Sequence, residues 1–128
     1  MPPISILLAD GDATLRHCLR QAVEEDPQIT ICWEAENGIQ ALLLAQQKQP
    51  CIALLEARMP RMDGLETTRI LRQRCHNVKI VVMSVYDDVR EPALAAGADD
   101  FWTKDRGRDT LRGMICRLAR AIELAPKY

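Results

Sequence analysis

The sequence has little of several features that would indicate a specialised class of protein. Aromatic residues make up 4% of its 128 positions, and there are two histidines. It has no run of the roughly 18 apolar residues that a membrane-spanning helix needs. The opening MPPISILLAD carries no basic segment before its short apolar run, as a secretory signal would. We therefore expect a cytoplasmic protein without a membrane partner.

Positive and negative charges are nearly balanced in the sequence. Seventeen Lys and Arg residues nearly balance eighteen Asp and Glu residues, so the formal net charge is −1. A nucleic-acid-binding surface depends on a basic field that attracts phosphates. We therefore expect no direct binding of nucleic acid by this chain.

The cysteine pattern lacks the spacing of a zinc or redox motif. Five cysteines are widely separated, with no C-x-x-C pair, and they stand among apolar neighbours. We expect them to be buried, reduced and inert. They are Cys18, Cys32, Cys51, Cys75 and Cys116.

What the sequence does contain is a fivefold alternation of strand and helix patterns. Short runs rich in Ile, Val and Leu alternate with stretches whose apolar residues recur at helical spacing and are expected to be buried. Examples of this spacing are Leu15, Cys18 and Leu19, then Ile39, Leu42 and Leu43, and near the end Leu111, Met114 and Ile115. Nearly continuous apolar runs are typical of parallel strands covered on both faces. We predict one domain over residues 1–128, an α/β fold of the (βα)5 doubly wound type with a five-stranded parallel sheet. The expected strands are 4–9, 29–35, 51–56, 79–85 and 100–104.

Polar residues follow these strands at the end where functional groups collect in open α/β sheets. Asp10 and Asp12 follow the first strand and Glu56 ends the third. Ser84 lies near the end of the fourth, and Lys104 ends the fifth. Each is individually common at a surface, but together they predict a shared crevice containing acids, a hydroxyl and a lysine.

These segments resemble the receiver domain of bacterial two-component response regulators along the whole chain. The matching stretches are ILLAD, NGIQALLLA, LLEARMPRMDGLE, VVMSVYDD and AAGADDFWTKD. The Lys-Asp pair at 104 and 105 is similar to the subfamily that usually carries a helix-turn-helix output domain. The resemblance implies a flavodoxin-like fold and a role in phosphorelay signalling.

The resemblance also implies a role for each matching residue. In receivers, two adjacent acids after the first strand and an aspartate after the third hold Mg²⁺, and that aspartate accepts a phosphoryl group. A hydroxyl and a lysine neutralise the charge that develops. By position, Asp10 corresponds to the first acid, Ser84 to the hydroxyl and Lys104 to the lysine. Phe101 corresponds to the aromatic residue that couples the site to the output surface.

Two positions depart from the family pattern, and both concern the phosphotransfer chemistry. Gly11 stands where the second acid would be, and Glu56 replaces the phosphoacceptor aspartate. The extra methylene of glutamate displaces its carboxylate by more than about 1 Å, which can cost roughly a hundredfold in rate. We expect no cofactor, with Mg²⁺ bound by Asp10, Asp12 and Glu56 only if Asp12 compensates for Gly11. The preferred role of Asp12 is to cap the first helix.

Three functions are compatible with these residues. We favour a non-enzymatic, unphosphorylated regulatory module in which Glu56 either mimics a phosphoryl group or merely keeps an ion pair with Lys104. If it mimics the phosphoryl group, Ser84 lies close and Phe101 turns inward. The second function is a working Mg²⁺-dependent phosphoacceptor, and the third is a structural dimerisation domain of a longer transcriptional regulator.

The expected partners are other signalling proteins or an output domain. The segment 86–97 is about two residues shorter than is usual in receivers. It contributes to the surface through which receivers dimerise and signal, so a homodimer is compatible with the sequence, but its usual mode is not expected.

Overall fold

The computed structural model describes residues 4–124. Five parallel strands form one sheet in the order β2-β1-β3-β4-β5. Their bounds are β1 Ile4–Ala9, β2 Ile29–Ala35, β3 Ile52–Glu56, β4 Lys79–Ser84 and β5 Asp100–Thr103. The helices are α1 Ala13–Val23, α2 Gly38–Lys48, α3 Gly64–Arg74, α4 Arg90–Ala96 and α5 Arg108–Leu124. Two short 3₁₀ helices, η1 Asp87–Val89 and η2 Lys104–Arg106, precede α4 and α5.

This arrangement confirms the predicted (βα)5 fold. The bounds of β1 and β2 agree with the sequence prediction, whereas β3, β4 and β5 are each one residue shorter at one end. Lys104 therefore lies beyond the last strand, as the first residue of η2.

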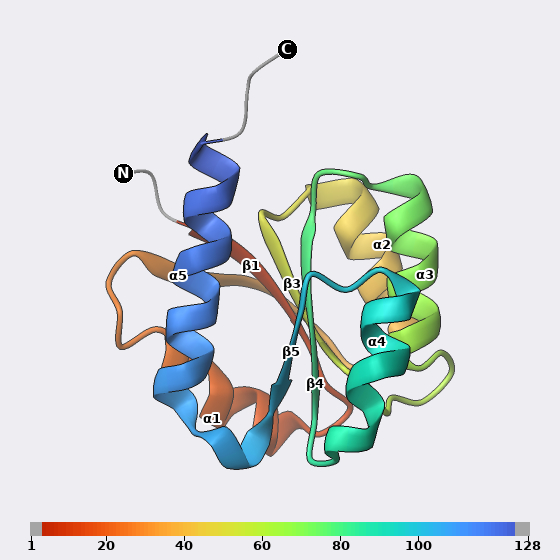
Figure 1. Cartoon of the computed structure of the whole chain (residues 1–128), viewed down its shortest axis with the longest axis horizontal. Helices are drawn as coiled ribbons and strands as arrows, with labels where there is room; N and C mark the ends of the chain where they lie inside the picture. Colours follow the sequence, from red (N-terminus) through yellow and green to blue (C-terminus); the bar gives the residue numbers. More distant parts are fainter. Residues whose placement is uncertain (1–3, 125–128) are drawn as a thin grey trace.

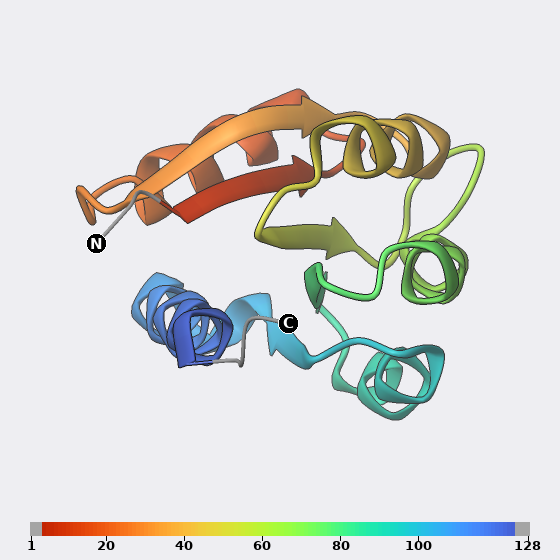
Figure 2. The same ribbon diagram turned by 90° about the horizontal axis from the view of Figure 1, so that it is seen from above.

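The helices form two layers, one on each face of the sheet. Helices α1 and α5 cover one face, and α2, α3 and α4 cover the other (Figures 1 and 2). Strand β3 shows why both faces are apolar. Its Ile52 and Leu54 pack in the cluster beneath α1 and α5, while Ala53 and Leu55 pack in the cluster beneath α2, α3 and α4. A continuous apolar run is thus required because both sets of side chains are buried.

The helix patterns identified the buried faces only in part. In α5, Leu111, Met114 and Ile115 are buried as expected. In α2, however, Ile39 and Leu43 are exposed. The buried small residues Ala41 and Ala45 bring that helix close to the sheet instead. Leu42 is buried as expected, so the apolar spacing was right for one of its three residues in α2 and missed the face that the alanines form.

The expectation of buried cysteines was wrong for all five. Cys18 and Cys32 are exposed, and Cys51, Cys75 and Cys116 are partly buried. Leu15, expected to pack with Cys18, is also 42% exposed. In α1 only the C-terminal residues Ala22 and Val23 are buried.

Among residues 4–124, no helix combines the length and the apolar character needed to cross a bilayer.

Candidate functional site

The carboxyl ends of the strands bring four of the predicted site residues together. Asp10 follows β1, Glu56 and Ser84 end β3 and β4, and Lys104 follows β5. The relative solvent exposure is 3% for Asp10, 9% for Glu56 and 2% for Ser84. Because β1 lies between β2 and β3, the chain reverses its direction of winding next to Asp10 and Glu56. This is the place where α/β sheets form their binding crevices.

An ion pair joins Lys104 to both buried acids. Its ammonium Nζ lies 2.7 Å from Glu56 Oε2 and 3.5 Å from Asp10 Oδ2. The contact with Glu56 is short, but its direction falls outside hydrogen-bond limits, so Oε2 is a buried oxygen without an aligned donor among the described residues. The 2.7 Å separation nevertheless makes Lys104 the close cationic partner of Glu56.

The two partners respond differently to burial. Burial raises the pKa of Glu56, and the attraction of Lys104 offsets this only in part. Burial lowers the pKa of Lys104, but Glu56 and Asp10 together outweigh that effect, so its pKa is raised. For Glu56 the effect of burial is the largest, and repulsion by Asp10 adds to it, so Lys104 and Arg58 do not restore the ordinary pKa. For Lys104 the two anionic partners outweigh burial.

Ser84 is buried beside this pair but is bonded elsewhere. Its Oγ accepts a hydrogen bond from the backbone N–H of Tyr86 at 3.0 Å. Among the described residues, no hydrogen bond joins Ser84 to Glu56. The hydroxyl thus stabilises the loop after β4 and does not contact the carboxylate through a direct hydrogen bond.

Phe101 has no exposed surface. It pairs with Val82 across β4 and β5 and belongs to the cluster beneath α2, α3 and α4. The ring of Phe101 therefore lies in the interior of the domain.

Asp12 caps α1 and does not extend toward a metal. Its Oδ1 accepts hydrogen bonds from the backbone N–H groups of Thr14 and Leu15, at 2.8 and 3.2 Å. The predicted capping role is thus confirmed. Asp10 Oδ1 in turn accepts the N–H of Asp12 at 2.9 Å. Gly11, which lies between them in the sequence, has no side chain that could bind a metal ion.

These residues do not fit a magnesium site. Mg²⁺ requires oxygen ligands in near-octahedral geometry. Here Asp12 is occupied by the helix cap, Gly11 supplies nothing, and Glu56 faces the lysine. No group of three or more His, Cys, Asp or Glu side chains within residues 4–124 is arranged to hold a metal ion.

The loop between β3 and α3 is packed tightly against the backbone of Glu56. A Cβ atom at Gly64 would lie 2.2 Å from the Glu56 carbonyl oxygen, so only glycine fits there. The Gly64 N–H donates to the Ala57 carbonyl at 2.8 Å, and Asp63 caps α3 through the Glu66 N–H. The Asp63-Gly64 turn consequently fixes the position from which the Glu56 side chain extends.

Sequence reasoning missed two arginines that border the site. The guanidinium of Arg58 lies 5.1 Å from the centre of the Tyr86 ring, and that of Arg90 lies 5.2 Å from the centre of the Phe101 ring. Both are cation–π distances. No local pattern reveals such contacts, because each pairs residues from different loops or elements.

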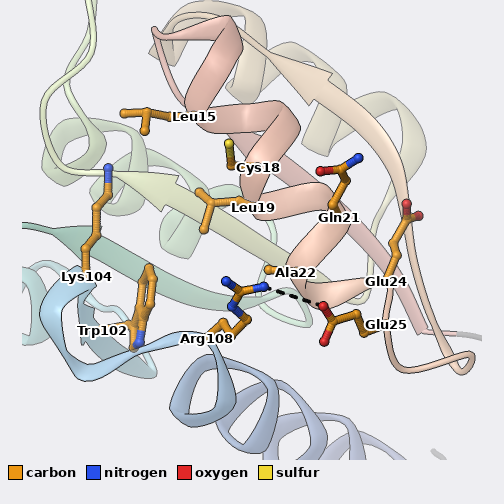
Figure 3. Close-up of a pocket in the computed structure, with 10 residues that line it drawn as sticks. All are labelled: Leu15, Cys18, Leu19, Gln21, Ala22, Glu24, Glu25, Trp102, Lys104 and Arg108. Atoms are coloured by element: carbon orange, nitrogen blue, oxygen red, sulfur yellow. Dashed lines mark hydrogen bonds and ion pairs between the residues drawn. The ribbon is translucent and has the colours of Figure 1, made fainter.

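A cavity of about 700 Å³ adjoins the site between α1 and the segment from β5 to α5 (Figure 3). Leu15, Leu19 and Trp102 contribute apolar surface, and Lys104 also lines it. Arg108 and Glu25 form an exposed ion pair of 3.5 Å beside it. The ion-paired lysine is therefore part of two features, the acidic crevice and this cavity.

The fold and site together define a class: an α/β receiver module with acids, a hydroxyl and a lysine at the strand ends. The model of the response regulator receiver domain matches residues 6–116. The chain belongs to this family, the receiver domains of two-component signalling systems.

Individual relatives agree with this assignment. The chain is 40% identical over 105 residues to the nitrate/nitrite response regulator protein NarL of Escherichia coli, covering 80% of this chain and 49% of that protein. It is 33% identical to a protein-glutamate methylesterase/protein-glutamine glutaminase of Pyrococcus horikoshii, covering 79% of this chain and 28% of that protein. The chain thus spans half or less of the length of these relatives.

Solved structures show the same fold. The signal receiver domain of a NarL response regulator from Mycobacterium tuberculosis matches with a TM-score of 0.88 and 25% identity, covering 94% of this chain and 98% of that one.

Proposed function

We propose that residues 1–128 form one receiver domain that acts as a regulatory protein-interaction module without enzymatic activity or phosphotransfer. In this proposal Glu56 substitutes for the phosphoryl group that other receivers acquire. The observation that carries the proposal is the 2.7 Å ion pair between Glu56 and Lys104. It gives the lysine a buried anionic partner without any phosphoryl donor.

The state of the rest of the site supports this proposal. Phe101 is fully buried, the position expected of the coupling aromatic residue in the active-like state. Asp12 caps a helix, and Gly11 and Glu56 do not complete a magnesium site. Phosphoryl transfer depends on positioned charge around the transferred group, so a receiver without this metal site is poorly equipped to catalyse it.

The mimicry is partial for two reasons. A carboxylate carries one negative charge, whereas a phosphoryl group carries close to two. Ser84 is hydrogen-bonded to the Tyr86 N–H rather than to Glu56. A contact shifts a two-state equilibrium only by its differential affinity for the two states, so Glu56 biases the domain toward the active-like state without locking it there.

The partners we propose are other signalling proteins or an output domain. The E. coli and P. horikoshii relatives extend well beyond the region that this chain matches. A further relative, at 32% identity, is the transcriptional regulatory protein YdfI of Bacillus subtilis. A receiver of this kind therefore acts by contact with another domain or protein, and a second copy of the chain is one such partner.

Intact-mass analysis after incubation with acetyl phosphate and Mg²⁺ tests this proposal. We expect no species heavier by one phosphoryl group in the wild type. The double variant Gly11→Asp/Glu56→Asp, which restores both acids, serves as the positive control and should become phosphorylated. A phosphoryl group mapped to Glu56 in the wild type would instead establish a working phosphoacceptor.

A further inference from the structure

Phe101 is covered from the solvent side by a cation. The guanidinium of Arg90, the first residue of α4, stands over the ring at 5.2 Å from its centre. Val82 on β4 and Ala93 on α4 pack with the ring in the same buried cluster. The ring thus lies between an apolar core on one side and a positive charge on the other.

Arg90 is itself held in position. Its Nε lies 3.4 Å from Asp87 Oδ1, and its backbone N–H donates to the Asp87 carbonyl at the end of η1. The Arg90 side chain retains 34% of its exposure, whereas the ring retains none. A cation that is partly removed from water interacts more strongly with an aromatic face than a fully hydrated one.

We propose that Arg90 is a positioning residue that holds Phe101 inward by a cation–π contact, so that α4 contributes to the state of the coupling aromatic residue. This inference rests on the proposed function, in which the inward ring is the active-like state. It adds a second determinant of that state. Glu56 acts through its ion pair with Lys104, and Arg90 acts through its contact with the ring.

The position of Arg90 depends on the short connection between β4 and α4. Ser84 ends β4, η1 begins at Asp87, and α4 begins immediately after η1. Only five residues therefore separate the buried hydroxyl from Arg90. In this proposal, a movement of the loop after Ser84 displaces the guanidinium from the ring.

The chain offers a direct probe because Phe101 is its only phenylalanine. Incorporation of 4-fluorophenylalanine gives a single ¹⁹F resonance, and its shift between H₂O and D₂O reports exposure of the ring. Arg90→Met keeps the length and removes the charge, while Arg90→Lys keeps a cation. Arg74→Met, at an exposed position on α3, is the matched control. Urea unfolding of each variant shows that it is folded.

We expect an inward, solvent-insensitive ring in the wild type, Arg90→Lys and Arg74→Met. In Arg90→Met the ratio of inward to outward populations should fall roughly 2- to 30-fold, the range that one cation–π contact can produce. An unchanged ring in Arg90→Met would overturn the inference, because packing alone would then hold it. An equal displacement of the Phe101 ring in Arg90→Lys would also overturn the inference, because the positive charge would then have no effect on the ring.

Glu56→Gln separates this inference from the proposed function. A ring displaced by Arg90→Met but not by Glu56→Gln supports the role of Arg90 and contradicts phosphoryl mimicry. The reverse pattern supports mimicry and overturns the role of Arg90. Displacement by both variants supports both, and displacement by neither overturns both.

Discussion

Lys104 lies 2.7 Å from Glu56 and 3.5 Å from Asp10, so one ammonium group balances two buried carboxylates. Removing one member of a buried ion pair leaves an uncompensated charge, and this costs far more than the loss of an exposed pair. Removing Lys104 should therefore destabilise the folded domain more than removing either carboxylate alone.

Lys104→Met should lower the free energy of unfolding by about 3 kcal/mol at pH 7, because both acids lose their cation. The loss should shrink toward about pH 4, where Glu56 binds a proton. Urea unfolding at the two pH values measures this. Lys79→Met, which removes a 4.0 Å contact with Asp99 in a partly exposed pair, is the control and should cost about 1 kcal/mol or less. Equal losses in the two variants would contradict the central role of Lys104.

The pH dependence of Glu56 has a definite sign. Its pKa is raised above the ordinary value of 4.5, so the folded chain holds this proton more tightly than the unfolded chain. Its contribution to stability is therefore fully present below about pH 4.5 and is lost as the pH rises through the folded pKa. The raised pKa of Lys104 has its effect in the alkaline range, where its stabilising contribution disappears above its ordinary value of 10.5.

Glu56→Gln removes the titrating group and keeps the shape. We expect the wild type to lose stability relative to Glu56→Gln between about pH 4 and pH 7, measured as the difference in unfolding free energy. A difference that runs the other way would mean that Lys104 lowers the pKa of Glu56 more than burial raises it.

Asp12 can be tested separately as a cap and as a metal ligand. Asp12→Ala should cost about 1 kcal/mol of unfolding free energy, because two N–H groups of α1 lose their acceptor. Asp12→Asn should retain most of that stability, since asparagine also caps helices. Neither variant should alter the response to Mg²⁺ in calorimetry. Loss of saturable Mg²⁺ binding in Asp12→Asn would instead identify Asp12 as a ligand.

Restoring the missing acids should restore metal binding. Gly11→Asp/Glu56→Asp is expected to bind Mg²⁺ much more tightly than the wild type, because hard divalent ions depend on the number and geometry of carboxylates. A Cβ at position 11 would lie 3.1 Å from Pro60 Cδ, so only a small shift of that ring is needed. Gly11→Ala/Glu56→Asp introduces the same Cβ without the carboxylate and is the matched control. Tight binding by the wild type itself would show that the present residues already form a site.

The order of the elements and the identity of the crevice residues follow from the amino-acid sequence alone. Strand β3 illustrates why: its run Ile-Ala-Leu-Leu must bury side chains on both faces, which requires a parallel sheet between two helical layers. Parallel strands bring their carboxyl ends to one edge, so Asp10, Glu56, Ser84 and Lys104 had to converge.

What those residues contact depends on tertiary packing. Whether Lys104 faces Glu56, whether Ser84 bonds to the carboxylate or to the Tyr86 N–H, and whether Phe101 is buried all depend on side-chain positions set by neighbouring loops. The contact between Arg90 and Phe101 is between residues eleven positions apart on different elements. No periodic pattern in the sequence predicts it. The exposed cysteines have the same origin, because burial depends on what packs against a face and not on the apolar character of adjacent residues in the sequence.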